Sequence, residues 1–235
     1  MNTQKFSSPT SESNLKDFIQ NAVQKHQSGE LDEAKFLYKN LLKIQPNFID
    51  VRDSWSNEYY AIVFTNLGTL SEQEGDLEAA IAYYKKALEL KPDYGEVYYN
   101  LGNVFLRQSK LEIAIESYQQ ALKIKPEYPQ AHNNLGNIFQ LQGKLESAIE
   151  SYQEALKIQP ESTVAYVNLG NILCDGGDLE AAIEKYKQAL KINPSFAPAK
   201  FGILISQIPI IYSNVAEINL TRSNYQQHLN ELAEN

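Results

Sequence analysis

A run of 34 residues recurs along the middle of this chain. Residues 95–128 read GEVYYNLGNVFLRQSKLEIAIESYQQALKIKPEY, and residues 129–162 read PQAHNNLGNIFQLQGKLESAIESYQEALKIQPES. Related runs fill residues 61–94 and 163–196, so one period covers residues 61–196. A fixed period of this length is the signature of a protein built by stacking similar structural units.

Several residue types keep this period, and most of them have a structural reason to do so. Each unit carries Asn-Leu-Gly near its start, Leu-Glu in its middle, then a tyrosine, Ala-Leu and a proline. Proline ends the second helix of each unit because it has no N–H and biases the preceding residue away from helix. The residues 34 apart include Gly68, Gly102, Gly136 and Gly170; Ala80, Ala114, Ala148 and Ala182; and Pro92, Pro126, Pro160 and Pro194.

The pattern resembles the tetratricopeptide (TPR) repeat, a helix–turn–helix unit of this length. The resemblance implies an all-α solenoid, a right-handed superhelix of helix–turn–helix units. In each unit we expect a first helix, helix A, over about 14 residues, and a second, helix B, over positions 18–31. Between them the sequence predicts a turn with positive φ at Gly75, Gly143 and Gly177, and at Ser109 in the remaining unit. The recurring glycine is expected where helices A and B cross closely, and Tyr84 and its equivalents are expected to fill space between units.

The flanking regions depart from the repeat. Residues 1–14 are polar and are predicted to be disordered, residues 15–48 form a degenerate unit, and residues 49–60 are an insertion. We expect the insertion to lengthen the next helix or to form a short excursion, with Trp55 packing in the irregular junction. Asn21-Ala22-Val23 replaces the Asn-Leu-Gly signature in the degenerate unit. Residues 197–235 are predicted to form a helical C-terminal cap or extension.

Part of this extension has a second resemblance. The segment Ser206–Tyr212, followed by Glu217-Ile218, Arg222, Tyr225 and Leu229, is similar to the junction between TPR arrays and the glycosyltransferase part of SPINDLY-type O-GlcNAc transferase-like proteins. The 39 residues after Phe196 (235 − 196) are too few for the transferase that follows in that family, so we expect no transferase in this sequence. The resemblance therefore implies at most a substrate-recruiting arm without its catalytic domain.

Composition and motifs argue against several other functions. The net charge of −8 disfavours nucleic acid, and the single cysteine excludes an internal disulfide and a cysteine-built metal site. The N-terminus has no apolar signal-peptide core, and no run reaches the roughly 18 apolar residues of a membrane helix. No nucleophile–base set or phosphate-binding loop is present. The sequence thus predicts a cytoplasmic protein that is not an enzyme and has no cofactor, no metal, no nucleic-acid partner and no membrane partner.

The candidate site is a ladder of asparagines on helix A. Positions 2, 5, 6, 9, 12 and 13 of each unit are expected to face the concave side of the superhelix. An Asn side chain offers an acceptor and two donors, so it can pair with a peptide backbone. In O-GlcNAc transferases, the resemblance implies, such a ladder holds protein substrates. The candidate contacts are Asn66, Asn100, Asn103, Asn134, Asn137, Asn168 and Asn171, with Arg107 as the only groove cation, facing Glu72, Glu96 and Asp175.

These positions allow two other interpretations. Asn-Leu-Gly-Asn is close to the general TPR consensus, so the asparagines could instead hold neighbouring helices together, and the exposure of the amides decides between the two. Positions 2 and 5 lack the lysines of the clamp with which some TPR domains bind chaperone C-termini, so that use is disfavoured.

The sequence therefore predicts a protein–protein interaction scaffold that holds an extended peptide or a partner helix in the concave groove. The alternative is the recruiting arm of a SPINDLY-type protein. Self-association through the ends of the array is a further possibility, because terminal repeats leave a packing face uncovered.

Overall fold

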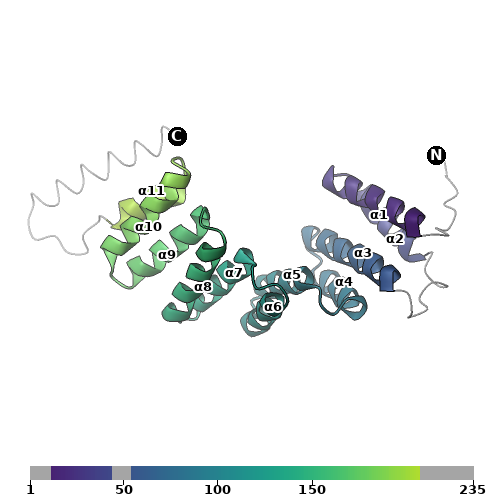
Figure 1. Ribbon diagram of the computed structural model, residues 1–235, viewed down its shortest axis with the longest axis horizontal. Coiled ribbons are helices and arrows are strands. Elements are labelled where there is room, and N and C mark those ends of the chain that lie inside the picture. The colour runs from purple at the N-terminus through teal and green to yellow at the C-terminus, as the bar shows by residue number, and fades with distance from the viewer. Residues whose placement is uncertain (1–11, 44–53, 207–235) are drawn as a thin grey trace, which may run out of the picture. The chain divides into compact units, whose positions relative to one another are not determined.

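The computed structural model describes residues 12–43 and 54–206, and every regular element in this part of the chain is an α-helix. The chain divides into two compact units, Met1–Pro126 and Glu127–Asn235. The first unit contains α1 (Glu12–Gln27), α2 (Leu31–Lys43), α3 (Ser54–Gln73), α4 (Leu77–Leu90), α5 (Gly95–Arg107) and α6 (Leu111–Ile124) (Figure 1). The second contains α7 (Pro129–Leu141), α8 (Leu145–Ile158), α9 (Thr163–Asp175), α10 (Leu179–Ile192) and α11 (Ala197–Ser206).

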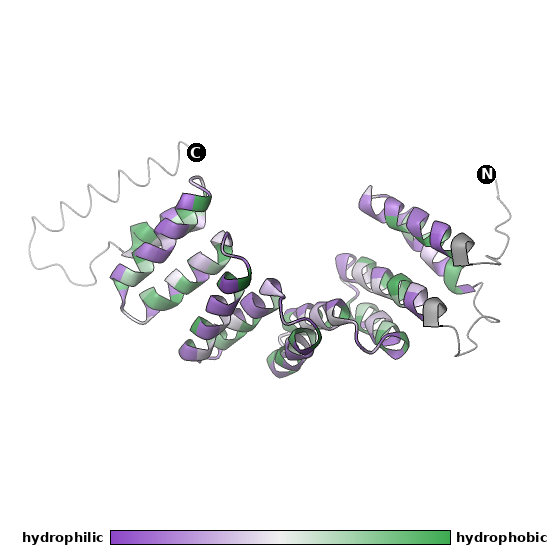
Figure 2. Cartoon of the chain, in the orientation of Figure 1, coloured by the Kyte–Doolittle hydropathy of each residue, from purple (hydrophilic) through white to green (hydrophobic). Residues whose placement is uncertain are grey.

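Successive helices pack as pairs inside each unit. In the first unit the pairs are α1 with α2, α3 with α4, and α5 with α6; α3 also packs on α1 and on α5. In the second, α7 pairs with α8 and α9 with α10, while α9 also packs on α7 and α11. Figure 2 shows that each helix carries both hydrophobic and hydrophilic residues, as amphipathic helices of a stacked array must. The predicted all-α repeat architecture is confirmed.

The turn inside each regular pair has the predicted backbone conformation. Gly75, Gly143 and Gly177 have φ of +83°, +70° and +83°, and Ser109 has φ of +58° in the remaining pair. A residue with a side chain rarely adopts this left-handed conformation, which is why glycine occupies three of the four places. Where Asp precedes helix B it also caps it: the Asp178 carboxylate accepts from the Ala181 N–H at 3.1 Å.

The recurring glycine on helix A makes room for the recurring tyrosine on helix B of the same pair. A Cβ atom added to Gly136 would lie 2.5 Å from Cε1 of Tyr152, and Gly102 and Tyr118 have the same relation at 2.5 Å. These tyrosines are fully buried. The prediction that such tyrosines fill space between units is therefore incomplete, because each ring also packs against the glycine of its own pair. That close ring contact is the reason for the small residue.

The N-terminal boundaries differ in part from those expected. Helix α1 begins at Glu12, so residues 12–14, which were included in the predicted disordered segment, are helical. Helix α3 begins at Ser54, so the insertion from that residue onward lengthens the first helix of its pair. Residues 1–11 and 49–53, and the side chain of Trp55, lie outside the described part, and their predictions stay open.

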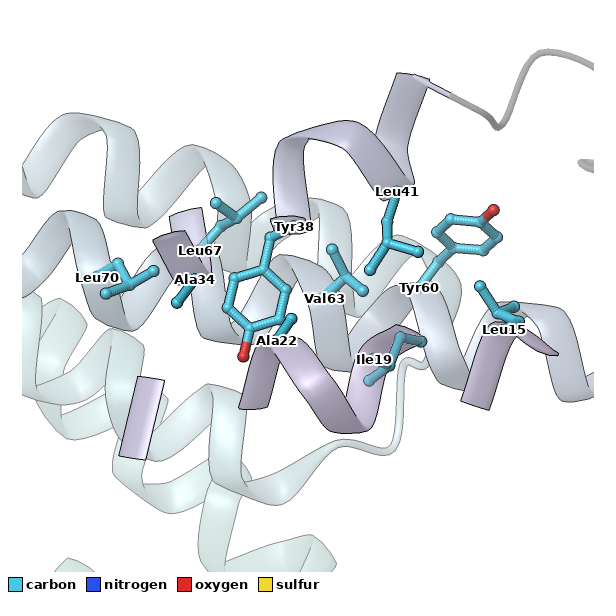
Figure 3. Close-up of a cluster of buried hydrophobic side chains, with 10 residues drawn as sticks. All are labelled: Leu15, Ile19, Ala22, Ala34, Tyr38, Leu41, Tyr60, Val63, Leu67 and Leu70. Carbon is cyan, nitrogen blue, oxygen red and sulfur yellow. The ribbon is translucent and has the colours of Figure 1, made fainter. Parts of the chain in front are cut away.

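The first helix pair closes on α3 through an apolar cluster. Leu15 and Ile19 from α1 and Leu41 from α2 are buried with Val63 and Leu67 of α3, and Figure 3 shows Tyr38 beside Ala22 and Ala34 within this cluster. The degenerate unit is thus a packed helix pair although it lacks the Asn-Leu-Gly signature.

Helix α11 continues the array as one more helix A. Ala199, which lies 34 residues after Ala165, is fully buried like Ala165, and Gly202 lies against the ring of Tyr186. The start of the predicted C-terminal extension, Ala197–Ser206, is therefore helical. Residues 207–235, including nearly all of the segment that resembles the transferase junction, lie outside the described residues.

Candidate peptide-binding site

The predicted site residues lie at positions 6 and 9 of helix A in the four regular pairs. Six of the seven asparagines are half-buried, and Asn171 is exposed. Within each compact unit we call the asparagine-bearing surface of its helices A the amide face, and the two units are described separately. In the first unit it consists of Asn66 on α3 and Asn100 and Asn103 on α5, and in the second of Asn134 and Asn137 on α7 and Asn168 and Asn171 on α9.

In the first unit, the amide face has two side chains available for a ligand. Among the described residues, Asn66 on α3 and Asn100 on α5 have no hydrogen-bond partner for their side chains, although both are half-buried. Asn103 differs, because its Oδ1 accepts a hydrogen bond from the Tyr118 hydroxyl at 2.7 Å. The position-6 amides here can therefore bind without first breaking a contact within the described chain.

Arg107 lies at the edge of the amide face in the first unit and is engaged by α3. Its Nη1 donates to the backbone oxygen of Glu72 at 3.1 Å and lies 3.4 Å from Oε1 of the same residue. The predicted contact between Arg107 and Glu72 is confirmed. Glu72 also accepts from the Tyr84 hydroxyl at 3.2 Å, so this exposed pair connects α5 to both helices of the preceding pair. A surface ion pair of this kind contributes at most about 1 kcal/mol.

In the second unit, the amides form a connected network. The hydroxyl of Tyr152 donates to Asn137 Oδ1 at 2.7 Å and also lies 3.1 Å from Gln140 Oε1, and that of Tyr186 donates to Asn171 Oδ1 at 2.9 Å. Asn168 Nδ2 donates to Asn137 Oδ1 at 3.0 Å and to Asn133 Oδ1 at 3.3 Å, which joins α9 to α7. The structure thus brings Asn137 and Asn168 together and gives both a structural role.

Sequence reasoning missed the tyrosine hydroxyls and Asn133. The signal was present in the spacing, since position 9 precedes the recurring tyrosine by 15 residues in every regular pair: Asn103 and Tyr118, Asn137 and Tyr152, Asn171 and Tyr186. Thr69 takes the same place before Tyr84, and the two hydroxyl oxygens lie 3.3 Å apart. Position 9 therefore holds a residue that can bond to a buried phenol.

Burial keeps these phenols protonated and able to donate. It raises the pKa of Tyr186 to about 12, and it raises the pKa of Tyr84 and Tyr152 well above the usual tyrosine value. A neutral phenol has one O–H to give, and its partner must offer an oxygen. The buried tyrosines therefore act on the amide face as fixed hydrogen-bond donors throughout the neutral pH range.

The amide ladder ends at α11. The residues 34 positions after Asn168 and Asn171 are Gly202, which is buried, and Ile205, which is 44% exposed. Phe201 on the same helix is 52% exposed. The surface of α11 is thus apolar where α7 and α9 carry amides.

The described residues offer little for other chemistry. No group of three or more His, Cys, Asp and Glu side chains in this part of the chain is placed to hold a metal ion. No helix among residues 12–43 and 54–206 has the length and apolarity needed to cross a membrane. The amide face can donate and accept hydrogen bonds through its asparagine side chains.

Comparison with known proteins identifies the repeat. One family model, described as a TPR repeat, matches residues 73–109 and 102–143, and another, described as a tetratricopeptide repeat, matches residues 127–195. Together they match just over half of the chain. The chain belongs to the tetratricopeptide repeat family. No curated protein matches this TPR chain by sequence, and neither family model describes an enzyme.

Solved structures agree with the TPR assignment. MamA, known from a crystal structure, is 27% identical in sequence to this chain, with a TM-score of 0.62. The match covers 75% of this chain and 96% of the MamA chain. PilF from Pseudomonas aeruginosa is 18% identical with a TM-score of 0.74, covering 95% of this chain and 92% of its own. YrrB is 21% identical with a TM-score of 0.60, covering 77% of this chain and 88% of its own. The last two identities establish the fold alone, and none of these proteins supports the resemblance to the transferase junction.

Proposed function

We propose that this TPR protein is an interaction scaffold whose amide face binds an extended segment of a partner protein. The observation that carries the proposal is the state of Asn66 and Asn100. Both amides are half-exposed on neighbouring helices, and neither has a hydrogen-bond partner in the described part of the chain. Polar groups that neither support the fold nor lie fully in water are suited to pair with a ligand.

The chemistry of the face favours a peptide backbone over a charged group. Asparagine amides pair with both the C=O and the N–H of a peptide, so they hold an extended chain whatever its side chains are. Arg107, the cation at the edge of the face in the first unit, is already engaged by Glu72. YrrB, a TPR protein of similar fold, is described as having an unusual peptide-binding site, so peptide binding occurs in a protein of this fold. The concave groove and the cytoplasmic location stay predictions.

The structure selects variants that separate binding from folding. Changing Asn66 and Asn100 together to Ala removes two amides that make no described hydrogen bond. A change at Asn168 would also break its bonds to Asn133 and Asn137. The matched control is Gln119→Ala with Gln120→Ala, which removes two exposed amides from helix B of the same compact unit.

The test is a pull-down from cell extract with wild type, the Asn66/Asn100 variant and the Gln119/Gln120 control, each checked for helix content by circular dichroism. We expect specific partners to be lost from the Asn66/Asn100 variant and kept by the control. Partners retained by a folded Asn66/Asn100 variant would contradict the proposal.

The alternative, a substrate-recruiting arm of a SPINDLY-type transferase, depends on residues 206–229. Almost all of these lie outside the described residues, and no comparison supports it. It stays a prediction from sequence resemblance.

A further inference from the structure

The buried tyrosines set the orientation of the position-9 amides in the second compact unit. Asn137 and Asn171 each accept a hydroxyl hydrogen through Oδ1, from Tyr152 and Tyr186 respectively. Each ring is held against a glycine of helix A, Gly136 or Gly170, so the hydroxyl has little freedom to move. With Oδ1 turned toward the phenol, the two N–H donors on Nδ2 point away from it.

The freed donors have no partner in the described chain. The Nδ2 groups of Asn137 and Asn171 make no hydrogen bond among the described residues, and Asn171 is exposed. Asn137 Oδ1, in contrast, is used twice, by Tyr152 and by Asn168. Position 9 of α7 and α9 therefore offers donors and no spare acceptor.

Asn168, at position 6 of α9, offers an unpaired acceptor where Asn137 and Asn171 offer unpaired donors. Its Nδ2 donates to Asn137 Oδ1 at 3.0 Å and to Asn133 Oδ1 at 3.3 Å, which uses both of its N–H groups. Its Oδ1 has no partner among the described residues. The α7–α9 surface thus carries unpaired donors at Asn137 and Asn171 and an unpaired acceptor at Asn168.

We propose that this ordered set of amides reads the polarity of an extended peptide backbone. Carbonyl oxygens of the partner accept from Nδ2 of Asn137 and Asn171, and a partner N–H donates to Oδ1 of Asn168. The inference rests on the proposed function and adds to it the chemistry at each position. An extended chain presents both C=O and N–H groups, so it can supply acceptors for the donors and a donor for the acceptor. A partner with proline at the N–H that meets Asn168 binds less well, because proline has no N–H.

An isosteric substitution tests the orientation. In Asn171→Asp, one carboxylate oxygen still accepts from Tyr186 while the other replaces the Nδ2 donor by an acceptor. The probe is an uncharged peptide, selected on the wild-type protein from a phage-displayed library of peptides about 12 residues long, synthesised with a fluorophore and titrated by fluorescence anisotropy. We expect Asn171→Asp to weaken binding at least about tenfold, because a peptide carbonyl then faces an oxygen. Gln153→Glu makes the same amide-to-acid change at an exposed site on α8 and should leave Kd within about twofold.

Asn171→Ala separates this inference from the proposed function. If Asn171→Ala weakens binding and Asn171→Asp does not, the amide face binds peptide with Asn171 as an acceptor, and the inferred polarity is overturned. If neither change affects Kd, the amide of Asn171 takes no part in binding, which overturns the inference while the Asn66 and Asn100 test of the proposed function still stands. A library that yields no peptide for the wild type contradicts both.

Discussion

The first helix pair, α1–α2, and the last complete pair, α9–α10, each bury the recurring tyrosine of helix B, but in different surroundings. In α9–α10 the ring of Tyr186 lies against Gly170, and its hydroxyl donates to Asn171 at 2.9 Å. In α1–α2 the residues at the same offsets from Tyr38 are Ala22 and Val23. Tyr38 is fully buried, and its hydroxyl has no hydrogen-bond partner among the described residues.

The two pairs show that burial of the tyrosine ring and a hydrogen-bond partner for its hydroxyl are separate requirements, although the regular repeats meet both. Burial of the ring needs neither the glycine nor the asparagine, because Tyr38 packs beside Ala22 without either (Figure 3). His26, whose ring stands edge-on to Tyr38 with centroids 6.3 Å apart, lies beside the phenol. What the regular pairs add is a close helix contact at the glycine and an oxygen for the phenol. In α7 and α9, position 9 is thus a structural position whose Nδ2 group has no partner among the described residues.

The largest expected effect is that of alkaline pH. An unfolded chain loses its phenol protons near the ordinary tyrosine pKa of about 10, whereas burial raises the pKa of Tyr186 to about 12 and also raises that of Tyr38. Between these values the folded state holds more protons than the unfolded state, so stability is full below pH about 10 and falls as the pH rises toward 12.

Spectroscopy checks this pH dependence. Absorbance at 295 nm should rise first as exposed tyrosines ionise, and then again in a second step that coincides with loss of the helical circular dichroism signal. A single ionisation step that is complete near pH 10 with the helices intact would contradict the burial of these phenols.

The next effect concerns the close contact at glycine. Gly136→Ala places a Cβ within 2.5 Å of the Tyr152 ring and should lower the free energy of unfolding by about 2 kcal/mol, since overpacking outweighs the gain in helix propensity. Ala22→Gly, the reverse change beside Tyr38, should cost only about 1 kcal/mol through helix propensity. Urea unfolding measures both. A stabilised Gly136→Ala variant would show that the ring can move away.

A smaller effect is expected from removing the phenol's partner. Asn171→Ala leaves the Tyr186 hydroxyl buried and unpaired, and should cost about 1 kcal/mol in urea unfolding. In a Tyr186→Phe background the same change should cost little, because no hydroxyl remains. Equal costs in the two backgrounds would mean that the hydrogen bond contributes nothing to stability.

The smallest effect is expected from supplying the missing partner in the first pair. Val23→Asn places an amide 15 residues before Tyr38, as in the regular pairs, and should raise the free energy of unfolding by about 0.5 kcal/mol, since satisfying a buried hydroxyl outweighs the loss of a half-buried apolar side chain. Val23→Ala is the control and should destabilise. A Val23→Asn variant no more stable than Val23→Ala would show that Tyr38 is held too far from position 23.

The sequence predicts the repeats and their turns well because these features depend on local, periodic constraints. Gly75, Gly143, Gly177 and Ser109 all have the positive φ expected of them. The hydrogen bond from Tyr152 to Asn137 was not predicted, because a period shows that both residues recur but not that their side chains meet. Which asparagines form hydrogen bonds within the protein was also not predictable from composition. Asn66 and Asn100 are unpaired among the described residues, whereas Asn168 is bonded to α7, and only the packing of helix on helix decides which amide finds a partner.

The most direct test of the amide face is a nuclear magnetic resonance titration of the isotopically labelled protein with the uncharged library-selected peptide. The side-chain N–H resonances of Asn66 and Asn100 should shift on binding, while those of Gln119 and Gln120 on helix B of the same compact unit should stay in place. Shifts confined to residues outside the amide face, with the asparagine amides unchanged, would contradict the account.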